Sequence, residues 1–170
     1  YNYIVIEMKY DKEFLQYVDE ILKSKEFQKR KKYPHHEDQS VYDHSLEVAY
    51  KSYLYAKKHN LNCKDISIGG LLHDFYYKPW QNSGIKKSFF KMHGFVHAKE
   101  ALENSLKHFP NLVNDRVANI ILRHMFPLNI IPPKYKESWV VTMIDKLCSL
   151  EVVKHPKSYS KYLGFNKKKE

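Results

Sequence analysis

Histidine and aspartate residues lie in apolar, helix-forming stretches of this 170-residue sequence: His44, the adjacent pair His73-Asp74, His124 and Asp145. A single histidine on an apolar face is more often a hydrogen-bonded core residue than a ligand, so the inference depends on the whole set. Asp145 is the most informative member, because it follows an apolar run and burying a carboxylate is costly unless a cation compensates its charge. Imidazole and carboxylate groups are typical ligands of divalent transition metals. The set therefore predicts a metal site.

The elements that position these residues are predicted to be helices. Apolar residues recur at helical spacing from Phe14 to Leu150, and the sequence holds only five Gly and seven Pro, which disfavours a turn-rich β architecture. A helical bundle brings residues from separate helices to one point. The stretch 76–92 is predicted to be a loop that frames the site. About six helices are expected. The first three run from Asp11 into the basic segment 29–32, from 41 to about 59 after the N-cap Ser40, and from the N-cap Asp65 to the pair 73–74. The last three run from 93–94 to near Pro110, from the N-cap Asn114 or Asp115 to 124, and from the N-cap Ser138 past 145.

The chain is strongly basic. The formal net charge is +10, from 29 Lys and Arg against 19 Asp and Glu, and such a field attracts nucleotides, phosphate esters and nucleic acid. The basic residues cluster at 29–32, 57–58, 86–87 and 167–169, where solvated helix ends are the better explanation. Charge alone therefore names no partner, and nucleic acid is not an expected one.

Composition also bears on location. No apolar run approaches the ~20 residues needed to span a bilayer, and no leader resembles a signal peptide, so no membrane association is expected. The two cysteines, Cys63 and Cys148, form neither a CxxC pair nor a dense disulfide framework. This usage favours a reducing, cytoplasmic location. The sequence gives no expectation for the oligomeric state.

Three motifs resemble the HD phosphohydrolase superfamily. They are a histidine in an early helix (His44, within Tyr-Asp-His-Ser-Leu-Glu-Val-Ala), the doublet His73-Asp74 after two leucines, and a distant helical Asp145 followed by Lys146. The resemblance covers roughly 41–153. It implies an all-α fold in which His44, His73, Asp74 and Asp145 bind a divalent metal. On this basis 1–170 is predicted to be a single HD domain, with an N-terminal arm and helix over 1–40, the core over 41–153 and a basic tail over 154–170.

Further histidines between the doublet and the last aspartate resemble those of dinuclear HD subfamilies, including bacterial diadenosine tetraphosphate hydrolases. They are His93, His97 and His124. The resemblance implies two metal ions, with His93 and His124 as additional ligands and Asp74 as a bridge. His97 has three possible roles: a ligand in place of His93, a proton carrier, or a helix cap. Fe or Mn is the expected metal, and the same ligands suit Ni, Co, Zn or Mg.

The resemblance also implies a reaction. We expect a metal-dependent phosphohydrolase that acts on a nucleotide or another small phosphate ester through metal-activated water. Asp74, His97, Arg123 and Lys78 are the expected catalytic residues, and Lys78, Arg123 and Lys146 the expected phosphate-binding residues. Two alternatives stay open: a metal-binding regulatory module without turnover, and an oxygenase similar to diiron HD enzymes.

Overall fold

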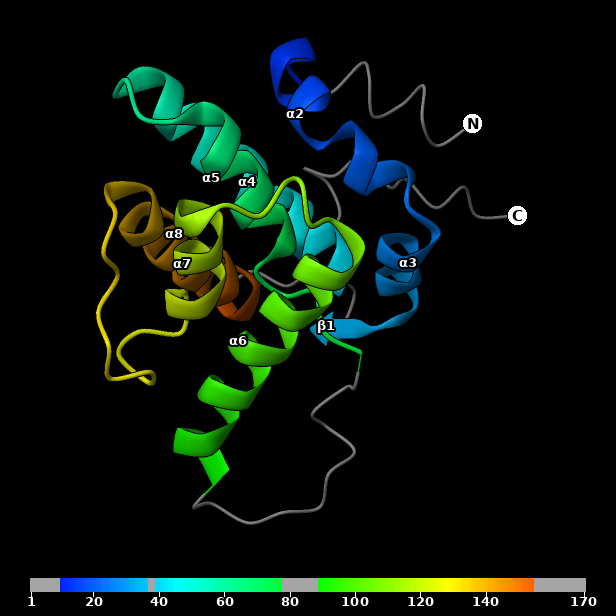
Figure 1. Ribbon diagram of the computed structural model, residues 1–170. Coiled ribbons are helices and arrows are strands. Elements are labelled where there is room, and N and C mark those ends of the chain that lie inside the picture. The colour runs from blue at the N-terminus through cyan, green and yellow to red at the C-terminus, as the bar shows by residue number, and fades with distance from the viewer. Residues whose placement is uncertain (1–9, 37–38, 78–88, 155–170) are drawn as a thin grey trace.

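The described part of the protein is almost entirely helical. The computed structural model describes residues 10–36, 39–77 and 89–154, with the side chains of 35–36, 89–95 and 151–154 outside the description. The all-α prediction is confirmed. The elements, shown in Figure 1, are α2 (Lys12–Lys23), α3 (Lys25–Gln28), the 3-10 helix η1 (Lys29–Lys32), β1 (Pro34–His36), β2 (Gln39–Ser40), α4 (Val41–Lys58), α5 (Cys63–Leu72), α6 (Phe89–His108), α7 (Asp115–Arg123) and α8 (Lys136–Lys154).

Helix α5 lies at the centre of the bundle, where it contacts α2, α4, α6, α7 and α8. It is built for close packing, since every residue from Asp65 to Leu72 is buried. At Gly70 an added Cβ would lie 2.9 Å from the Cα of Ala49 on α4, and at Gly69 it would lie 2.8 Å from side-chain atoms of Ile120 on α7. The two glycines therefore let α4 and α7 approach α5 closely from different sides.

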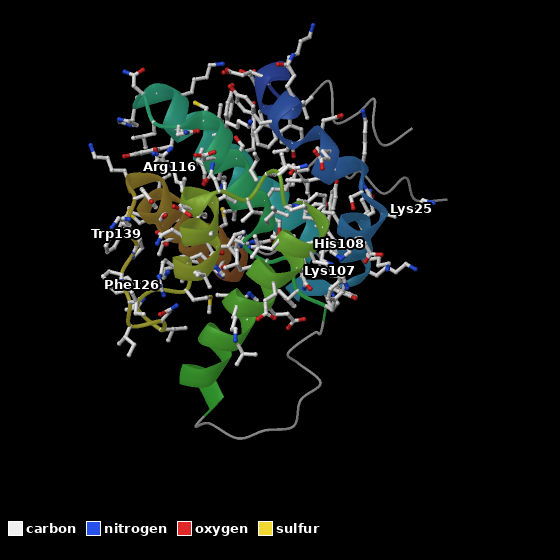
Figure 2. All side chains as sticks on the ribbon, viewed as in Figure 1. Lys25, Lys107, His108, Arg116, Phe126 and Trp139 are labelled. Carbon is white, nitrogen blue, oxygen red and sulfur yellow. The ribbon has the colours of Figure 1, made fainter. Side chains whose placement is uncertain are left out.

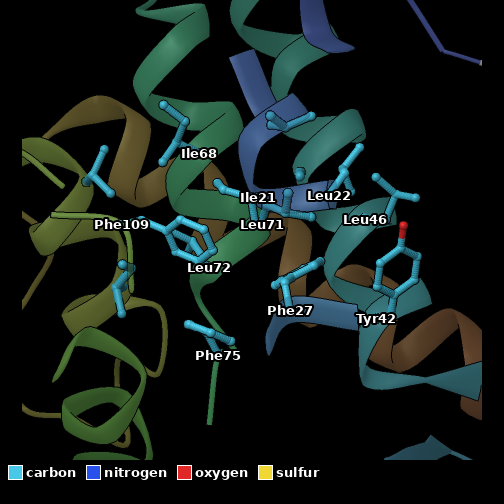
Figure 3. Close-up of a cluster of buried hydrophobic side chains, with 14 of the residues drawn as sticks. Ile21, Leu22, Phe27, Tyr42, Leu46, Ile68, Leu71, Leu72, Phe75 and Phe109 are labelled. Carbon is cyan, nitrogen blue, oxygen red and sulfur yellow. The ribbon is translucent and has the colours of Figure 1, made fainter. Parts of the chain in front are cut away.

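The largest apolar cluster joins α2 to the central helices. The buried face of α2 consists of Phe14, Val18, Ile21 and Leu22, which recur at helical spacing. These side chains pack in one cluster with residues of α3, α4, α5 and the segment that follows α5, as Figure 3 shows. Members outside α2 include Phe27, Tyr42, Leu46, Tyr53, Ile68, Leu71, Leu72, Phe75 and Phe109. This cluster fixes the end of α5 against the N-terminal helices.

Side-chain caps set several helix starts. Ser40 caps α4 as predicted, and it forms a capping box with Asp43 that places His44 in the first turn. Asn114 caps α7, which decides between the two predicted caps. The prediction for α5 was wrong, because Asn62 is the cap and Asp65 lies inside the helix. Asp65 instead accepts hydrogen bonds from the side chains of Asn114 and Arg116 at 3.0 Å each, and so ties the start of α5 to that of α7.

Three predicted boundaries also differ. The first helix stops at Lys23, because Ser24 adopts an extended conformation and caps the short helix α3. Helix α6 begins at Phe89, inside the stretch predicted as a loop, and continues through Gly94, so this glycine does not break the helix. Helix α8 begins before the predicted cap Ser138, since the Trp139 amide donates to the Tyr135 carbonyl at 3.2 Å.

A structured connection over 124–135 joins α7 to α8. Its Phe126–Pro127 peptide bond is cis. The ring of Trp139 stands edge-on to that of Phe126 with centroids 5.3 Å apart, and Figure 2 shows both at one edge of the molecule. Elsewhere, β1 and β2 form an antiparallel pair. No helix within the described ranges has the length and apolarity needed to cross a membrane.

The close approach of α5 to α4 predicts the effect of Gly70→Ala. A Cβ directed at the Ala49 backbone cannot be relieved by rotating a side chain, so the helices must separate. We expect the free energy of unfolding to fall by about 1–2 kcal/mol, because overpacking outweighs the gain in helix propensity. Urea denaturation measures this change. Lys64→Ala at an exposed position of α5 is the control, and equal stability of both variants and the wild type would contradict the packing argument.

Candidate metal centre

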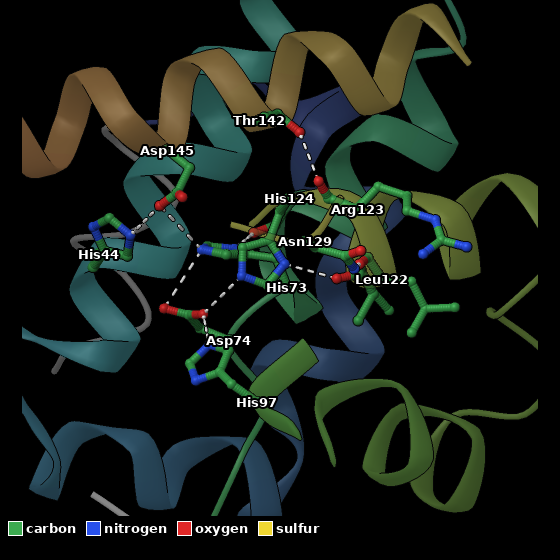
Figure 4. A network of polar contacts seen from close by, with 12 residues as sticks. His44, His73, Asp74, His97, Leu122, Arg123, His124, Asn129, Thr142 and Asp145 are labelled. Carbon is green, nitrogen blue, oxygen red and sulfur yellow. Dashed lines mark hydrogen bonds and ion pairs between the residues drawn. The ribbon is translucent and has the colours of Figure 1, made fainter. Parts of the chain in front are cut away.

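Side chains from five helices or helix ends meet in one polar cluster inside the bundle, as Figure 4 shows. Helices α4, α6 and α8 each contribute one residue, the end of α5 contributes two adjacent residues, and the end of α7 contributes one. The members are His44, His73, Asp74, His97, His124 and Asp145. These residues lie up to about a hundred positions apart in sequence, so only the packing of the bundle brings them together.

The first group of possible ligands consists of His44, His73 and Asp145, whose ligand atoms all lie within 4.8 Å of one another. The Nε2 of His44 donates to Oδ1 of Asp145 at 3.0 Å. The Nε2 of His73 lies 3.5 Å from the same oxygen. Both imidazoles are completely buried, and Asp145 is partly buried.

The second group consists of Asp74, His97 and His124, again within 4.8 Å of one another. The Nε2 of His97 donates to Oδ1 of Asp74 at 2.6 Å, and the Nε2 of His124 lies 3.6 Å from that oxygen. The other oxygen of Asp74, Oδ2, lies 3.5 Å from the Nε2 of His73 in the first group. One carboxylate of Asp74 thus faces both groups.

The end of α5 explains how adjacent residues reach the same site. Leu72 is the last residue of α5, and His73 keeps a helical conformation as its C-cap. The chain then turns sharply, since the amide of Phe75 donates to the Leu72 carbonyl and that of Tyr76 to the Asp74 carbonyl. Asp74 therefore leaves the helical path directly after His73. The expectation that the helix ends at this doublet is confirmed.

Two of the imidazoles have their protonation pattern fixed by the backbone. The Nδ1 of His73 lies 2.7 Å from the Gly70 carbonyl, and the Nδ1 of His124 lies 2.7 Å from the Ile121 carbonyl. A carbonyl oxygen only accepts, so Nδ1 carries the hydrogen in both rings and the neutral ring presents a bare lone pair at Nε2. Both Nε2 atoms are buried without a hydrogen bond. This pattern is usual for metal-bound histidine, whose other nitrogen is held by a carbonyl.

The electrostatics of the cluster favour ionised carboxylates. Burial alone would raise the pKa of Asp74 and of Asp145, but the surrounding imidazoles hold both pKa values well below the usual range for aspartate. Burial would likewise lower the pKa of His73, yet the two carboxylates outweigh it and raise that pKa to about 9. Burial, together with the charge of His73, lowers the pKa of His124 to about 4. Near neutral pH the cluster thus holds two ionised carboxylates, a protonated His73 and a neutral His124, whose Nε2 is available as a donor to a cation.

The remaining residues predicted for the site are placed differently. Figure 4 shows the guanidinium of Arg123 directed away from the imidazoles. The ammonium of Lys146 donates to the carbonyls of His124 and Thr142 at 3.1 and 3.3 Å, which are protein groups and not a substrate. Lys78 and the side chain of His93 lie outside the described residues.

Sequence reasoning missed Arg30. The run 29–32 was predicted to be solvated, and this is wrong for Arg30, which is completely buried. Its guanidinium lies over the rings of Tyr33, Phe75 and Tyr77 at 4.7 to 5.1 Å from their centroids and donates to the Tyr76 carbonyl. Arg30, from the N-terminal part of the chain, therefore fixes the segment directly after Asp74. The sequence has an aromatic residue close to Arg30, at Tyr33, and others at Phe75 and Tyr77, but no local pattern indicates that these distant segments meet.

Family comparison gives one match. The HD domain model matches residues 41–150, which is well over half of the chain and includes all six clustered residues. The comparisons with curated proteins and with solved structures give no significant match. The extent of the family match is sufficient on its own, and the chain belongs to the HD-domain family.

Proposed function

We propose that the protein is a metal-dependent phosphohydrolase with a dinuclear centre, acting on a nucleotide or another small phosphate ester. The observation that carries this proposal is the pair of buried Nε2 atoms of His73 and His124, which lack hydrogen bonds and face the carboxylate of Asp74. At His124 the neutral ring presents a lone pair to this carboxylate, and the two repel each other unless a cation lies between them. At His73 the carboxylates raise the pKa to about 9, and a divalent ion would take the place of the proton that they favour. HD domains are typically metal-dependent hydrolases, which agrees with this chemistry.

The proposed ligands fall into two sets that share Asp74. His44, His73 and Asp145 would hold the first ion, and His97 and His124 the second. The hydrogens that His44 and His97 now donate to carboxylates would be released on binding, as metal association with imidazole requires. His97 takes the ligand role first expected for His93, because its Nε2 lies in the second group.

The chain's own residues supply orientation and charge. When bound, two divalent ions supply Lewis acidity toward a phosphoryl group and a source of hydroxide at neutral pH. The Gly70 and Ile121 carbonyls fix the direction in which His73 and His124 present their Nε2 atoms. The carboxylates of Asp74 and Asp145 balance the positive charge. The four imidazoles and two carboxylates suit Fe or Mn, and also Ni, Co or Zn.

The substrate class is supported by charge and by resemblance. A formal net charge of +10 attracts polyanions such as nucleotides. The additional histidines resemble those of diadenosine tetraphosphate hydrolases, which makes a dinucleoside polyphosphate the first substrate to test, followed by a nucleoside monophosphate. Lys78 and Arg123 remain candidates for contact with phosphate. The low cysteine content of the sequence, Cys63 and Cys148, agrees with a cytoplasmic location.

Metal addition is expected to stabilise the protein. At a hundredfold excess over the dissociation constant, Mn²⁺ should add about 2.7 kcal/mol and raise the midpoint of thermal unfolding by roughly 5–10 °C. Chelator-treated protein provides the baseline. Ca²⁺ is the control, because it prefers sites of six to eight oxygen ligands, roughly, and the cluster is mostly imidazole. Equal shifts with Mn²⁺ and Ca²⁺ would contradict a specific centre.

Metal stoichiometry tests the assignment of ligands. We expect two ions per chain in the wild type, one in His97→Ala and in His124→Ala, and none in Asp74→Ala, which removes the shared ligand. His93→Ala should keep two ions, as should the control His59→Ala, which alters an exposed histidine at the end of α4. Elemental analysis of protein purified without chelator measures the content. Loss of an ion in His93→Ala with retention in His97→Ala would reverse the assignment.

Turnover separates the proposed enzyme from the two alternatives. With Mn²⁺ present, we expect release of phosphate or nucleotide from p-nitrophenyl phosphate or diadenosine tetraphosphate, and no release by Asp145→Ala. Metal binding without turnover on any phosphate ester would favour a regulatory module. Oxygen uptake by the iron-loaded protein with a polyol or phosphonate would favour an oxygenase.

A further inference from the structure

The carbonyls at the end of α7 are capped by donors from outside that helix. The Leu122 carbonyl accepts from Nδ2 of Asn129 at 2.9 Å (Figure 4). The Thr142 hydroxyl lies 3.3 Å from the Arg123 carbonyl, but its single hydrogen goes to the nearer Ser138 carbonyl at 2.8 Å, and the Arg123 carbonyl accepts from the Phe126 amide at 2.9 Å. The next carbonyl, that of His124 itself, accepts from Nζ of Lys146 at 3.1 Å. The last carbonyls of a helix lack partners within the helix, so donors from other parts of the chain to three successive carbonyls fix the end of α7.

Lys146 is the charged member of this cap. Its ammonium also donates to the Thr142 carbonyl one turn earlier in α8, so a single group links the backbones of α7 and α8. The C-terminus of a helix carries partial negative charge, which favours a cation at this position. With two ammonium hydrogens donated to carbonyls, at most one remains for a substrate, and this arrangement favours a role in positioning.

The residues on either side of this link belong to different metal sets. Asp145 precedes Lys146 on α8 and lies with His44 and His73, whereas His124 at the end of α7 lies with Asp74 and His97. The Nε2 of His124 can face Asp74 only while the end of α7 keeps its present rotation. The hydrogen bond from His124 Nδ1 to the Ile121 carbonyl fixes the ring relative to α7, and the Lys146 bond fixes α7 relative to α8.

We propose that Lys146 is a positioning residue for the second metal ion, which it serves by fixing the backbone of His124 against α8. This inference rests on the proposed dinuclear centre. It replaces the expected phosphate contact of Lys146 with a structural link between the two sets of ligands. Its consequence is specific: loss of the ammonium should weaken the second ion and spare the first, although Lys146 is adjacent to a ligand of the first.

The test compares Lys146→Met, Lys146→Arg and Lys136→Met. Met keeps the apolar length of the side chain without a donor, and Arg keeps both charge and donors. Lys136→Met removes the same charge from an exposed position at the start of α8 and is the matched control. Each protein is stripped with chelator and titrated with Mn²⁺, the two dissociation constants are measured, and folding is checked by thermal unfolding of the metal-free form.

We expect the second dissociation constant of Lys146→Met to rise by roughly 10–100-fold, the usual effect of removing a group that supports a ligand. The first constant should stay within about twofold, Lys146→Arg should recover most of the loss, and Lys136→Met should match the wild type. Unchanged binding of both ions in folded Lys146→Met would overturn the inference, as would equal weakening of both ions.

A variant of the same cap covers the case in which Lys146→Met fails to fold. Asn129→Leu removes the Nδ2 bond to the Leu122 carbonyl with little change of shape, and it should weaken the second ion in the same selective way. Unchanged binding in that variant would then overturn the inference. The wild-type titration tests the proposed centre separately, because a wild type that binds fewer than two ions contradicts the dinuclear proposal whatever the variants do.

Discussion

Two carboxylates enclosed by imidazoles are the constraint on which the rest of this structure depends. Asp74 and Asp145 stay ionised inside a helical bundle, and four histidine rings lie between or beside them. Burying an ionised carboxylate without a partner costs several kcal/mol, roughly, of folding free energy. The imidazoles offset this cost only where they lie close to the carboxylates, so the helices that carry them must be held in fixed positions. The Nε2 atoms of His73 and His124 face these carboxylates at 3.5 to 3.6 Å without a hydrogen bond, an arrangement that a bound cation would complete.

This constraint explains why α5 is packed so closely. Its C-terminal end carries His73 and Asp74, so the helices that bear the other ligands must come within side-chain reach of that end. Gly70 permits α4 to approach with His44, and Gly69 permits α7 to approach with His124. The N-terminal helices also contact this end of α5, and Arg30 donates a hydrogen bond to the Tyr76 carbonyl just after it. The same close packing around α5 therefore builds the apolar core and positions the proposed ligands.

The sequence predicted what is encoded locally and missed what depends on distant contacts. Ser40 was identified as a cap because a serine before an apolar helical run has a local physical meaning, and the helical fold class followed from apolar spacing. Arg30 was assigned to solvent because its neighbours along the chain are lysines, whereas the rings that enclose it come partly from residues 75–77. The start of α6 was missed for a similar reason, since Gly94 resembles a helix boundary in sequence but is tolerated inside the helix.

The choice between His93 and His97 marks the limit of reasoning from sequence. Residues four apart in a helix lie on the same face, separated by about 6 Å along the axis, so both histidines fit a helix that faces the cluster. Counting ligands cannot distinguish them, because either one completes the second set. The position of α6 relative to the end of α5 brings Nε2 of His97 to 2.6 Å from Oδ1 of Asp74. This contact with a carboxylate that also faces His73 and His124 supports the proposal of His97 as a ligand, and no sequence spacing contains it.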